Sequence, residues 1–185
     1  MNTLSSIIEN IDSQLATARD SKDHSSYSPF LSGVQEQLRR YIQVTAGGLS
    51  LAVPIDDLYE VGHLPGITTL PNLPAWILGI VSLREEIISV VDLNNLFFSM
   101  KTDIKKSSRL VVLQKGQMKV GIVIDRIIAT ISRPDSDRTV VTNSLLHKAA
   151  PEVFQESIVI DDEVFHLLEA RSFFAFDRLL NYYDA

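Results

Sequence analysis

The four histidines of the chain are the residues best suited to bind a metal ion or to transfer a proton near neutral pH. A helical metal site needs two imidazoles one turn apart, as in H-E-x-x-H, so that both point at one ion. The histidines do not have this spacing, and they stand at His24, His63, His147 and His166. We interpret them as surface or packing residues and predict no bound metal and no cofactor.

Two pairs of adjacent aspartates, Asp56-Asp57 and Asp161-Asp162, have the residue types of a general acid and base. Aspartate is also common at strand ends, because its side chain accepts hydrogen bonds from the backbone of a turn. Apolar segments flank Asp161-Asp162 on both sides, as expected for a tight turn between strands. We therefore interpret both pairs as turn residues.

Other catalytic patterns are missing from the sequence. There is no G-x-S-x-G nucleophile elbow, no G-x-G-x-x-G fingerprint and no G-x-x-x-x-G-K-[ST] phosphate loop. There is also no cysteine, which excludes disulfides, thiol nucleophiles and cysteine-based zinc or iron–sulfur sites. The sequence therefore predicts a protein that is not an enzyme.

The composition is typical of a globular protein, with 45% hydrophobic and 22% charged residues among 185. This length fits one domain or two small, associated subdomains. A net charge of −6 does not favour binding to nucleic acid or to an anionic membrane. No apolar stretch approaches the roughly 18 residues that span a bilayer, and the N-terminus lacks a secretory pattern.

Two helices are predicted in the first forty residues, on either side of a polar linker at residues 20–29. The second would span residues 29–40, with Phe30, Val34 and Leu38 on one face. Such apolar faces fit either packing on the domain or docking to a partner. The apolar stripe of the first helix consists of Leu4, Ile7, Ile8, Ile11, Leu15 and Ala18.

The pattern then changes to short strands. Residues 40–55 and 108–125 are each predicted to form a β-hairpin, with Gly47-Gly48 and Lys115-Gly116-Gln117 at the turns. Two further strands are predicted at residues 85–93 and 162–170.

The chain also resembles itself. Residues 49–61 (LSLAVPIDDLYEV) align with residues 118–130 (MKVGIVIDRIIAT), and residues 85–97 align with residues 162–174 in the same order. Two such matches indicate a duplicated all-β unit with about five short strands in each copy. A unit of that length suits a small barrel, because a barrel closes on itself and hides its edges.

Several motifs resemble those of the CheW-like family of chemotaxis coupling proteins. They are LYEV at 58–61, PNLPAWILGI at 71–80, SLR at 82–84, VVDL at 90–93 and GIVIDRI at 121–127. The similarity covers about residues 38–180 and is most specific in its first half. It implies a mainly β fold of two intertwined, SH3-like five-stranded β-barrel subdomains, here with an N-terminal helical extension.

The resemblance also implies a domain division and a role. We expect the helical extension and linker at residues 1–38 and the CheW-like domain at residues 39–180. The implied role is a cytoplasmic, non-catalytic adaptor that couples the cytoplasmic tip of a chemoreceptor to the regulatory domain of a CheA-type histidine kinase. Two alternatives stay open: a scaffold of a pilus or twitching-motility array, and an unrelated β-barrel interaction module.

The resemblance further implies a receptor groove between the two barrels, with an apolar floor for affinity and an arginine fork for orientation. For that arginine, Arg84, a solvated hairpin charge is the alternative interpretation. The implied partner-binding residues are Leu58, Glu60, Arg84, Val120 and, in the adjoining strand, Ile87 and Ile88.

The chain departs from the family motif at three positions, where Ser82 replaces Asn, Glu85 replaces Gly and Ser89 replaces Pro. Glycine at position 85 would supply a positive φ, so Glu85 makes the turn bulkier and more negative. Gly79 is expected to permit close backbone approach. Trp76 is interpreted as a plug that closes one barrel, with a partner hot spot as the alternative.

Overall fold

The computed structural model describes residues 36–181. The predicted helix at the N-terminus and the division at residue 38 lie wholly or partly outside this range, so both stay predictions. The predicted helix over residues 29–40 is wrong in its last turn, because Leu38–Arg40 begin a strand. Leu38 pairs with Pro134 and Arg40 with Ser132. This pairing overrides the helical spacing of the apolar residues.

Two mixed sheets organise the described residues, in the orders β8-β1-β2-β11-β10-β9 and β3-β6-β7-β5-β4. The strands of the first sheet are β1 (Leu38–Ala46), β2 (Leu49–Pro54), β8 (Arg126–Pro134), β9 (Arg138–Val140), β10 (Glu156–Ile160) and β11 (Glu163–Leu167). Those of the second are β3 (Leu58–His63), β4 (Ile77–Leu83), β5 (Glu86–Val91), β6 (Arg109–Lys115) and β7 (Met118–Ile124). The fold is therefore mainly β, as the sequence predicted.

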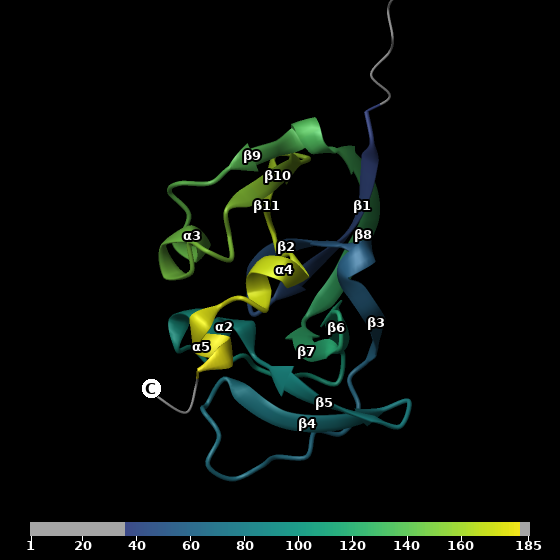
Figure 1. The fold of residues 1–185 in the computed structure, drawn as a ribbon, viewed down its shortest axis with the longest axis vertical. Coiled ribbons are helices and arrows are strands. Elements are labelled where there is room, and N and C mark those ends of the chain that lie inside the picture. The colour runs from purple at the N-terminus through teal and green to yellow at the C-terminus, as the bar shows by residue number, and fades with distance from the viewer. Residues whose placement is uncertain (1–35, 182–185) are drawn as a thin grey trace, which may run out of the picture. The chain divides into compact units, whose positions relative to one another are not determined.

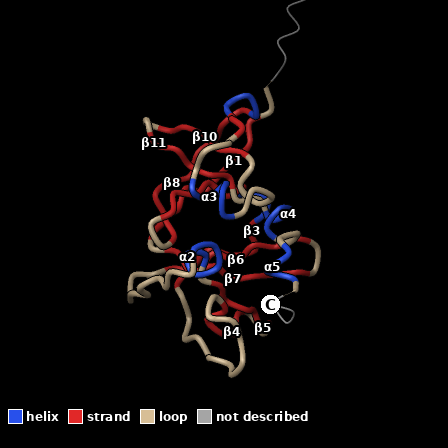
Figure 2. The backbone as a smooth tube through the Cα atoms, turned by 90° about the vertical axis from the view of Figure 1, so that its left-hand side faces the viewer, coloured by secondary structure: helices blue, strands red, loops and turns tan. Residues whose placement is uncertain are grey.

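Short helices join these strands. Two single turns of 3-10 helix, η1 (Ile55–Asp57) and η2 (Asp135–Asp137), follow β2 and β8. Figure 2 shows the α-helices gathered between the two groups of strands. They are α2 (Leu93–Phe98), α3 (Leu145–Ala149), α4 (Ala170–Phe173) and α5 (Asp177–Leu180).

The predicted duplication is confirmed by the strand pairing. The β1–β2 hairpin corresponds to the β6–β7 hairpin, and the β4–β5 hairpin to the β10–β11 hairpin. In each sheet the first hairpin joins the second through a parallel pair, β2 with β11 and β5 with β7. The strand that follows each first hairpin is exchanged between the sheets. β3 follows the β1–β2 hairpin but pairs with β6, and β8 follows the β6–β7 hairpin but pairs with β1. The two SH3-like subdomains are thus intertwined (Figure 1).

The expected five strands per copy hold for one sheet, whereas the other has β9 as a sixth. β9 lies along β10, and its counterpart in the first copy is reduced to a single bridge between Thr68 and Ile80. Gly79 precedes this bridge with φ of 138°, and a Cβ at this position would lie 2.2 Å from the Thr68 carbonyl oxygen. The expected close backbone approach at Gly79 is confirmed.

The turns of the two equivalent hairpins have the same backbone conformation. Arg84 and Glu85 have φ of 49° and 69°, and Asp161 and Asp162 have φ of 49° and 64°. Two consecutive left-handed residues are typical of the two-residue turn that matches strand twist. Asp161-Asp162 is therefore a turn, as predicted, and both hairpins accept strain at positions that glycine would relieve.

Residues 36–181 contain three apolar clusters, one inside each subdomain and one between the two sheets. The cluster of the six-stranded sheet consists of Tyr41, Ala52, Ile158, Ile160, Phe165 and Leu167. That of the five-stranded sheet consists of Val81, Ile88, Val90, Leu110, Val112 and Val123. The largest combines the other faces of both sheets with the helices, and we call it the central core.

Trp76 is 3% exposed and belongs to the central core. Trp76 is therefore buried, as predicted, but it lies between the two sheets and does not close one barrel, so that part of the prediction is wrong. Its carbonyl accepts a 2.9 Å hydrogen bond from the Asp92 amide. The Asp92 carboxylate in turn caps α2, accepting from the amides of Asn94 and Asn95. The VVDL motif thus has a structural role in starting that helix.

Candidate partner-binding surface

Arg84 projects from the β4–β5 turn and forms an ion pair with Glu60 of β3. The distance from Arg84 Nε to Glu60 Oε2 is 2.8 Å. The arginine side chain is 69% exposed and the glutamate side chain 21%. The structure therefore brings two of the predicted residues together, and one face of the arginine fork is already occupied from within the chain.

A second ion pair lies beside the first. Lys119 of β7 donates a 2.6 Å hydrogen bond to Glu86 Oε1, and its Nζ lies 3.8 Å from the centre of the Tyr59 ring. The hydrogen bond from Lys119 lowers the pKa of Glu86, and the same bond raises the pKa of Lys119. Sequence reasoning missed Lys119 and Tyr59, because the charge pairing depends on β5 and β7 lying side by side.

The two isoleucines of β5 have opposite environments, since successive side chains of a strand point to opposite faces. Ile87 is 74% exposed, and the small Ser82 lies opposite it on β4. Ile88 is 1% exposed and belongs to the cluster inside the five-stranded subdomain. Ile87 is thus available at the surface and Ile88 is not, and contact of either residue with a partner stays a prediction.

Leu58 and Val120 lie on one row across the five-stranded sheet. Leu58 pairs with Leu113, Leu113 with Val120, and Val120 with Ser89. Both predicted residues are half-buried and pack against the central core. The row leads from these half-buried residues to Ser89 of β5, which is exposed.

An apolar groove of about 270 Å³ opens beside Ser89 and Val120. Ile87 shares a face of β5 with Ser89, which lines the groove, so the exposed isoleucine continues it along the strand. Leu180 of α5 borders it and is 52% exposed. The groove is lined by Trp76, Ile77, Ser89, Val91, Met118, Lys119, Val120, Phe174, Leu179 and Leu180.

We call the residues around the β4–β5 turn the recognition edge: Glu60, Arg84, Glu85, Glu86, Ile87 and Lys119. It combines an exposed apolar side chain with charges, four of which are fixed in two internal ion pairs. It also lies next to a groove of apolar character. Surfaces of this composition, with apolar anchors beside a polar rim, are typical of protein-binding sites.

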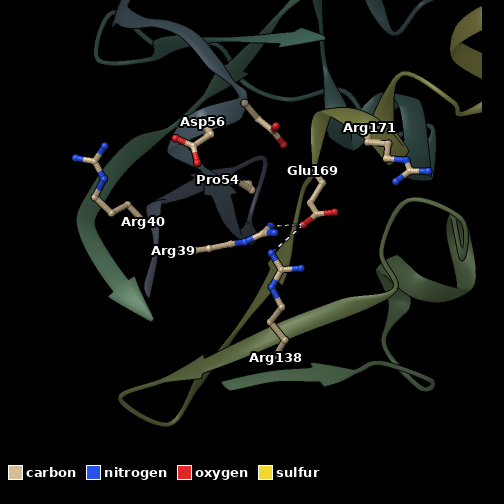
Figure 3. A pocket seen from close by; sticks show the side chains of 8 residues that line it. Arg39, Arg40, Pro54, Asp56, Arg138, Glu169 and Arg171 are labelled. Carbon is tan, nitrogen blue, oxygen red and sulfur yellow. Dashed lines mark ion pairs between the residues drawn. The ribbon is translucent and has the colours of Figure 1, made fainter. Parts of the chain in front are cut away.

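A separate, charged pocket of about 330 Å³ lies on the six-stranded subdomain. Figure 3 shows the guanidinium groups of Arg39 and Arg138 converging on Glu169. Arg138 also donates to the Tyr41 hydroxyl and to Glu156. These contacts tie β9 to β1, β10 and the start of α4. Sequence reasoning missed this network, because it joins β1 to residues far along the chain, with 97 positions between Tyr41 and Arg138.

The acidic pair at η1 has a structural partner in this pocket. The Asp57 carboxylate accepts a 2.8 Å hydrogen bond from the Ala170 amide at the start of α4. Burial raises the pKa of Asp57, and the nearby carboxylates of Glu169 and Asp56 add to the rise. The hydrogen bond between Asp57 and Ala170 attaches the β2–β3 connection to α4.

Two histidines of the described residues, His147 and His166, both contact Phe154. His147 Nδ1 lies 2.8 Å from the Phe154 carbonyl oxygen, and the His166 ring packs edge-on against the Phe154 ring. Burial lowers the pKa of His166. Within residues 36–181, no three His, Cys, Asp or Glu side chains form a group that could hold a metal ion. His24 lies outside the described residues.

The family model for the CheW-like domain matches residues 40–177, and the chain therefore belongs to the CheW-like family. Among known structures, the scaffolding protein TtCheW from Thermoanaerobacter tengcongensis matches with a TM-score of 0.64 and 22% identity. The match covers 80% of this chain and 91% of TtCheW. This likeness shows a shared fold.

Curated relatives match over shorter stretches. Protein PilI of Pseudomonas aeruginosa is 25% identical over 81 residues, which are 44% of this chain and 46% of PilI. Protein FrzA of Myxococcus xanthus is 31% identical over 49% of this chain and 57% of FrzA. Chemotaxis protein CheW of Helicobacter pylori is 27% identical over 60% of this chain and 67% of its own length. The chain thus spans about half the length of the first two relatives.

No helix within residues 36–181 has the length and apolar character needed to cross a membrane.

Proposed function

We propose that the chain is a non-catalytic adaptor that couples chemoreceptors to a CheA-type histidine kinase. Membership of the CheW-like family and the two intertwined subdomains support this role. The observation that carries it is the recognition edge, where the Arg84–Glu60 pair stands beside the exposed Ile87. Both members of the pair lie at positions that the family resemblance assigns to the receptor groove.

The receptor tip is proposed to lie along the recognition edge and the adjoining groove. Burial of Ile87 and of the groove residues Val120 and Leu180 supplies apolar contact area. Arg84 keeps donors free, because a guanidinium has five N–H groups and Glu60 occupies one side of it. These donors orient the partner by bonding its carboxylates or carbonyls.

The kinase regulatory domain is proposed to use the remaining barrel surfaces, so that both partners bind at once. The opposite hairpin offers such a surface, since Val159 and Val164 pair across β10 and β11 and are 53% and 46% exposed. An adaptor needs two separate surfaces, and the duplicated architecture supplies two equivalent hairpins.

Calorimetric titration of the full chain with each purified partner tests the proposal. The partners are the cytoplasmic fragment of a chemoreceptor and the CheA regulatory domain, both encoded in the genome that encodes this chain. Saturable binding of each at an equimolar ratio is expected. Binding of neither would contradict the coupling role.

The relatives named PilI and FrzA, beside those named CheW, favour a second candidate, the same adaptor role in a pilus or twitching array. Deletion of the gene distinguishes the two. Loss of flagellar taxis supports the first candidate, whereas loss of surface translocation with normal swimming supports the second.

A further inference from the structure

We propose that Glu85 selects the partner of the recognition edge, by requiring a basic side chain next to the apolar group that covers Ile87. This inference rests on the proposed receptor-binding role of that edge. It assigns a function to the position where the chain departs from the family's glycine.

The charges of the recognition edge are paired with each other except for one. Glu60 is paired with Arg84, and Glu86 is paired with Lys119. Among the described residues, Glu85 forms no ion pair or side-chain hydrogen bond, and its side chain is exposed. The edge therefore has one excess negative charge, and that charge is at Glu85.

Glu85 stands at the second position of the turn, with φ of 69°, and Ile87 follows two residues later with 74% of its surface exposed. A partner that covers Ile87 must also remove water from the neighbouring carboxylate. Removing water from an unpaired carboxylate is unfavourable unless a cation replaces it. The geometry therefore favours a partner with a lysine or arginine beside its apolar anchor, and disfavours one with a carboxylate there.

Retention of glutamate at this turn has a cost in backbone strain, since a side chain at positive φ is less favourable than glycine. The strained conformation is held on both sides, by the Arg84–Glu60 pair and by the Glu86–Lys119 pair. Strained backbone is common at binding sites, which supports a role of Glu85 in binding, and the neighbouring Ile87 distinguishes this turn by its greater exposure.

The equivalent hairpin supplies a matched control. Asp162 has φ of 64°, occupies the same place in its turn as Glu85 and is also exposed. Val164 follows it two residues later, as Ile87 follows Glu85. Replacement of either acidic residue by lysine therefore changes charge by the same amount, in the same backbone conformation, on different subdomains.

The experiment measures binding of full-length wild type, Glu85→Lys, Glu85→Gly and Asp162→Lys to the cytoplasmic fragment of a chemoreceptor from the same genome. Each titration is repeated at low and high salt, and the thermal midpoint of each variant is recorded. We expect Glu85→Lys to weaken binding at least tenfold, because like charges then meet. Glu85→Gly is expected to weaken binding less and to reduce its salt dependence, since one ion pair is lost. Asp162→Lys is expected to bind within twofold of wild type.

Unchanged or tighter binding by Glu85→Lys would overturn the assignment of Glu85, and so would an equal loss in Asp162→Lys. Absence of binding by the wild type would instead contradict the proposed receptor-binding role itself. The thermal midpoints separate loss of binding from loss of folding. If Glu85→Lys is unstable, Glu85→Gly still tests the role of the carboxylate, because glycine suits the turn.

Discussion

Arg84 Nε lies 2.8 Å from Glu60 Oε2, although Glu60 is on β3 and β3 is not a neighbour of β4 or β5 in the sheet. The pair connects the β4–β5 turn to β3. It holds the exposed arginine in one direction before any partner arrives. A pre-oriented arginine loses less side-chain freedom on binding, which favours affinity.

Replacement of Arg84 by alanine is expected to affect binding more than folding. The arginine side chain is 69% exposed and that of Glu60 21% exposed, and a surface ion pair contributes about 1 kcal/mol or less to stability. Loss of an interface anchor costs about 2 kcal/mol or more in binding. Chemical denaturation and titration with the receptor fragment measure the two quantities.

The exchange variant, Glu60→Arg with Arg84→Glu, separates the roles of the pair. It should restore the stability of the folded chain while receptor binding stays weak, because the cation then lies on β3. Full recovery of binding in the exchange variant would show that Arg84 acts only through its contact with Glu60.

The isoleucines of β5 should respond in opposite ways. Ile88→Ala is expected to lower the free energy of unfolding by about 2–5 kcal/mol, because it leaves a cavity in the five-stranded subdomain. Ile87→Ala is expected to change stability by about 0.5 kcal/mol or less, yet to weaken receptor binding. Denaturant midpoints of both variants provide the measurement, and equal destabilisation by both would contradict the assigned strand faces.

Gly79→Ala tests the close contact beside the Thr68–Ile80 bridge. A Cβ at residue 79 would lie 2.2 Å from the Thr68 carbonyl oxygen, with φ of 138°. We expect a loss of about 3 kcal/mol or more, because backbone must move. The control is Gly116→Ala, at φ of 59° with no atom within 4 Å of the added Cβ. Its loss is expected near 1 kcal/mol, and a similar loss at both sites would argue against the contact.

Local structure could be predicted from the sequence, whereas contacts between distant residues could not. The hairpins and the duplication were predictable, since strand alternation and turn residues are local patterns. The same alternation distinguishes Ile87 from Ile88 only when the buried face is known. The Arg39–Glu169 and Arg138–Glu169 pairs were not predictable, because they depend on how distant strands meet. Likewise, Leu38–Arg40 form a strand because they pair with β8, although the spacing of the apolar residues predicted a helix.

Stability is expected to fall below pH 6.5 through His166. Burial, and then the neighbouring His147, lower its pKa in the folded chain below the usual 6.5. The unfolded chain therefore binds the proton first, so the stability that the neutral ring contributes is complete above pH 6.5. It is lost as the pH falls from 6.5 through the lowered pKa of the folded state.

Urea denaturation of wild type and His166→Gln between pH 5 and 8 measures this effect. The difference in unfolding free energy between the two should shrink as the pH is lowered. His63→Gln is the control, because His63 is exposed at the end of β3. A constant difference between wild type and His166→Gln over this range would exclude His166 as the source.

The coupling role is tested most directly by mixing the full chain with the receptor fragment and the CheA regulatory domain, and by measuring the mass of the complexes by light scattering after gel filtration. Simultaneous binding at separate surfaces predicts one complex that contains all three proteins. Arg84→Glu should remove the receptor fragment from that complex and leave the kinase domain bound. Competition between the receptor fragment and the kinase domain for the chain, or joint loss of both in Arg84→Glu, would contradict the account.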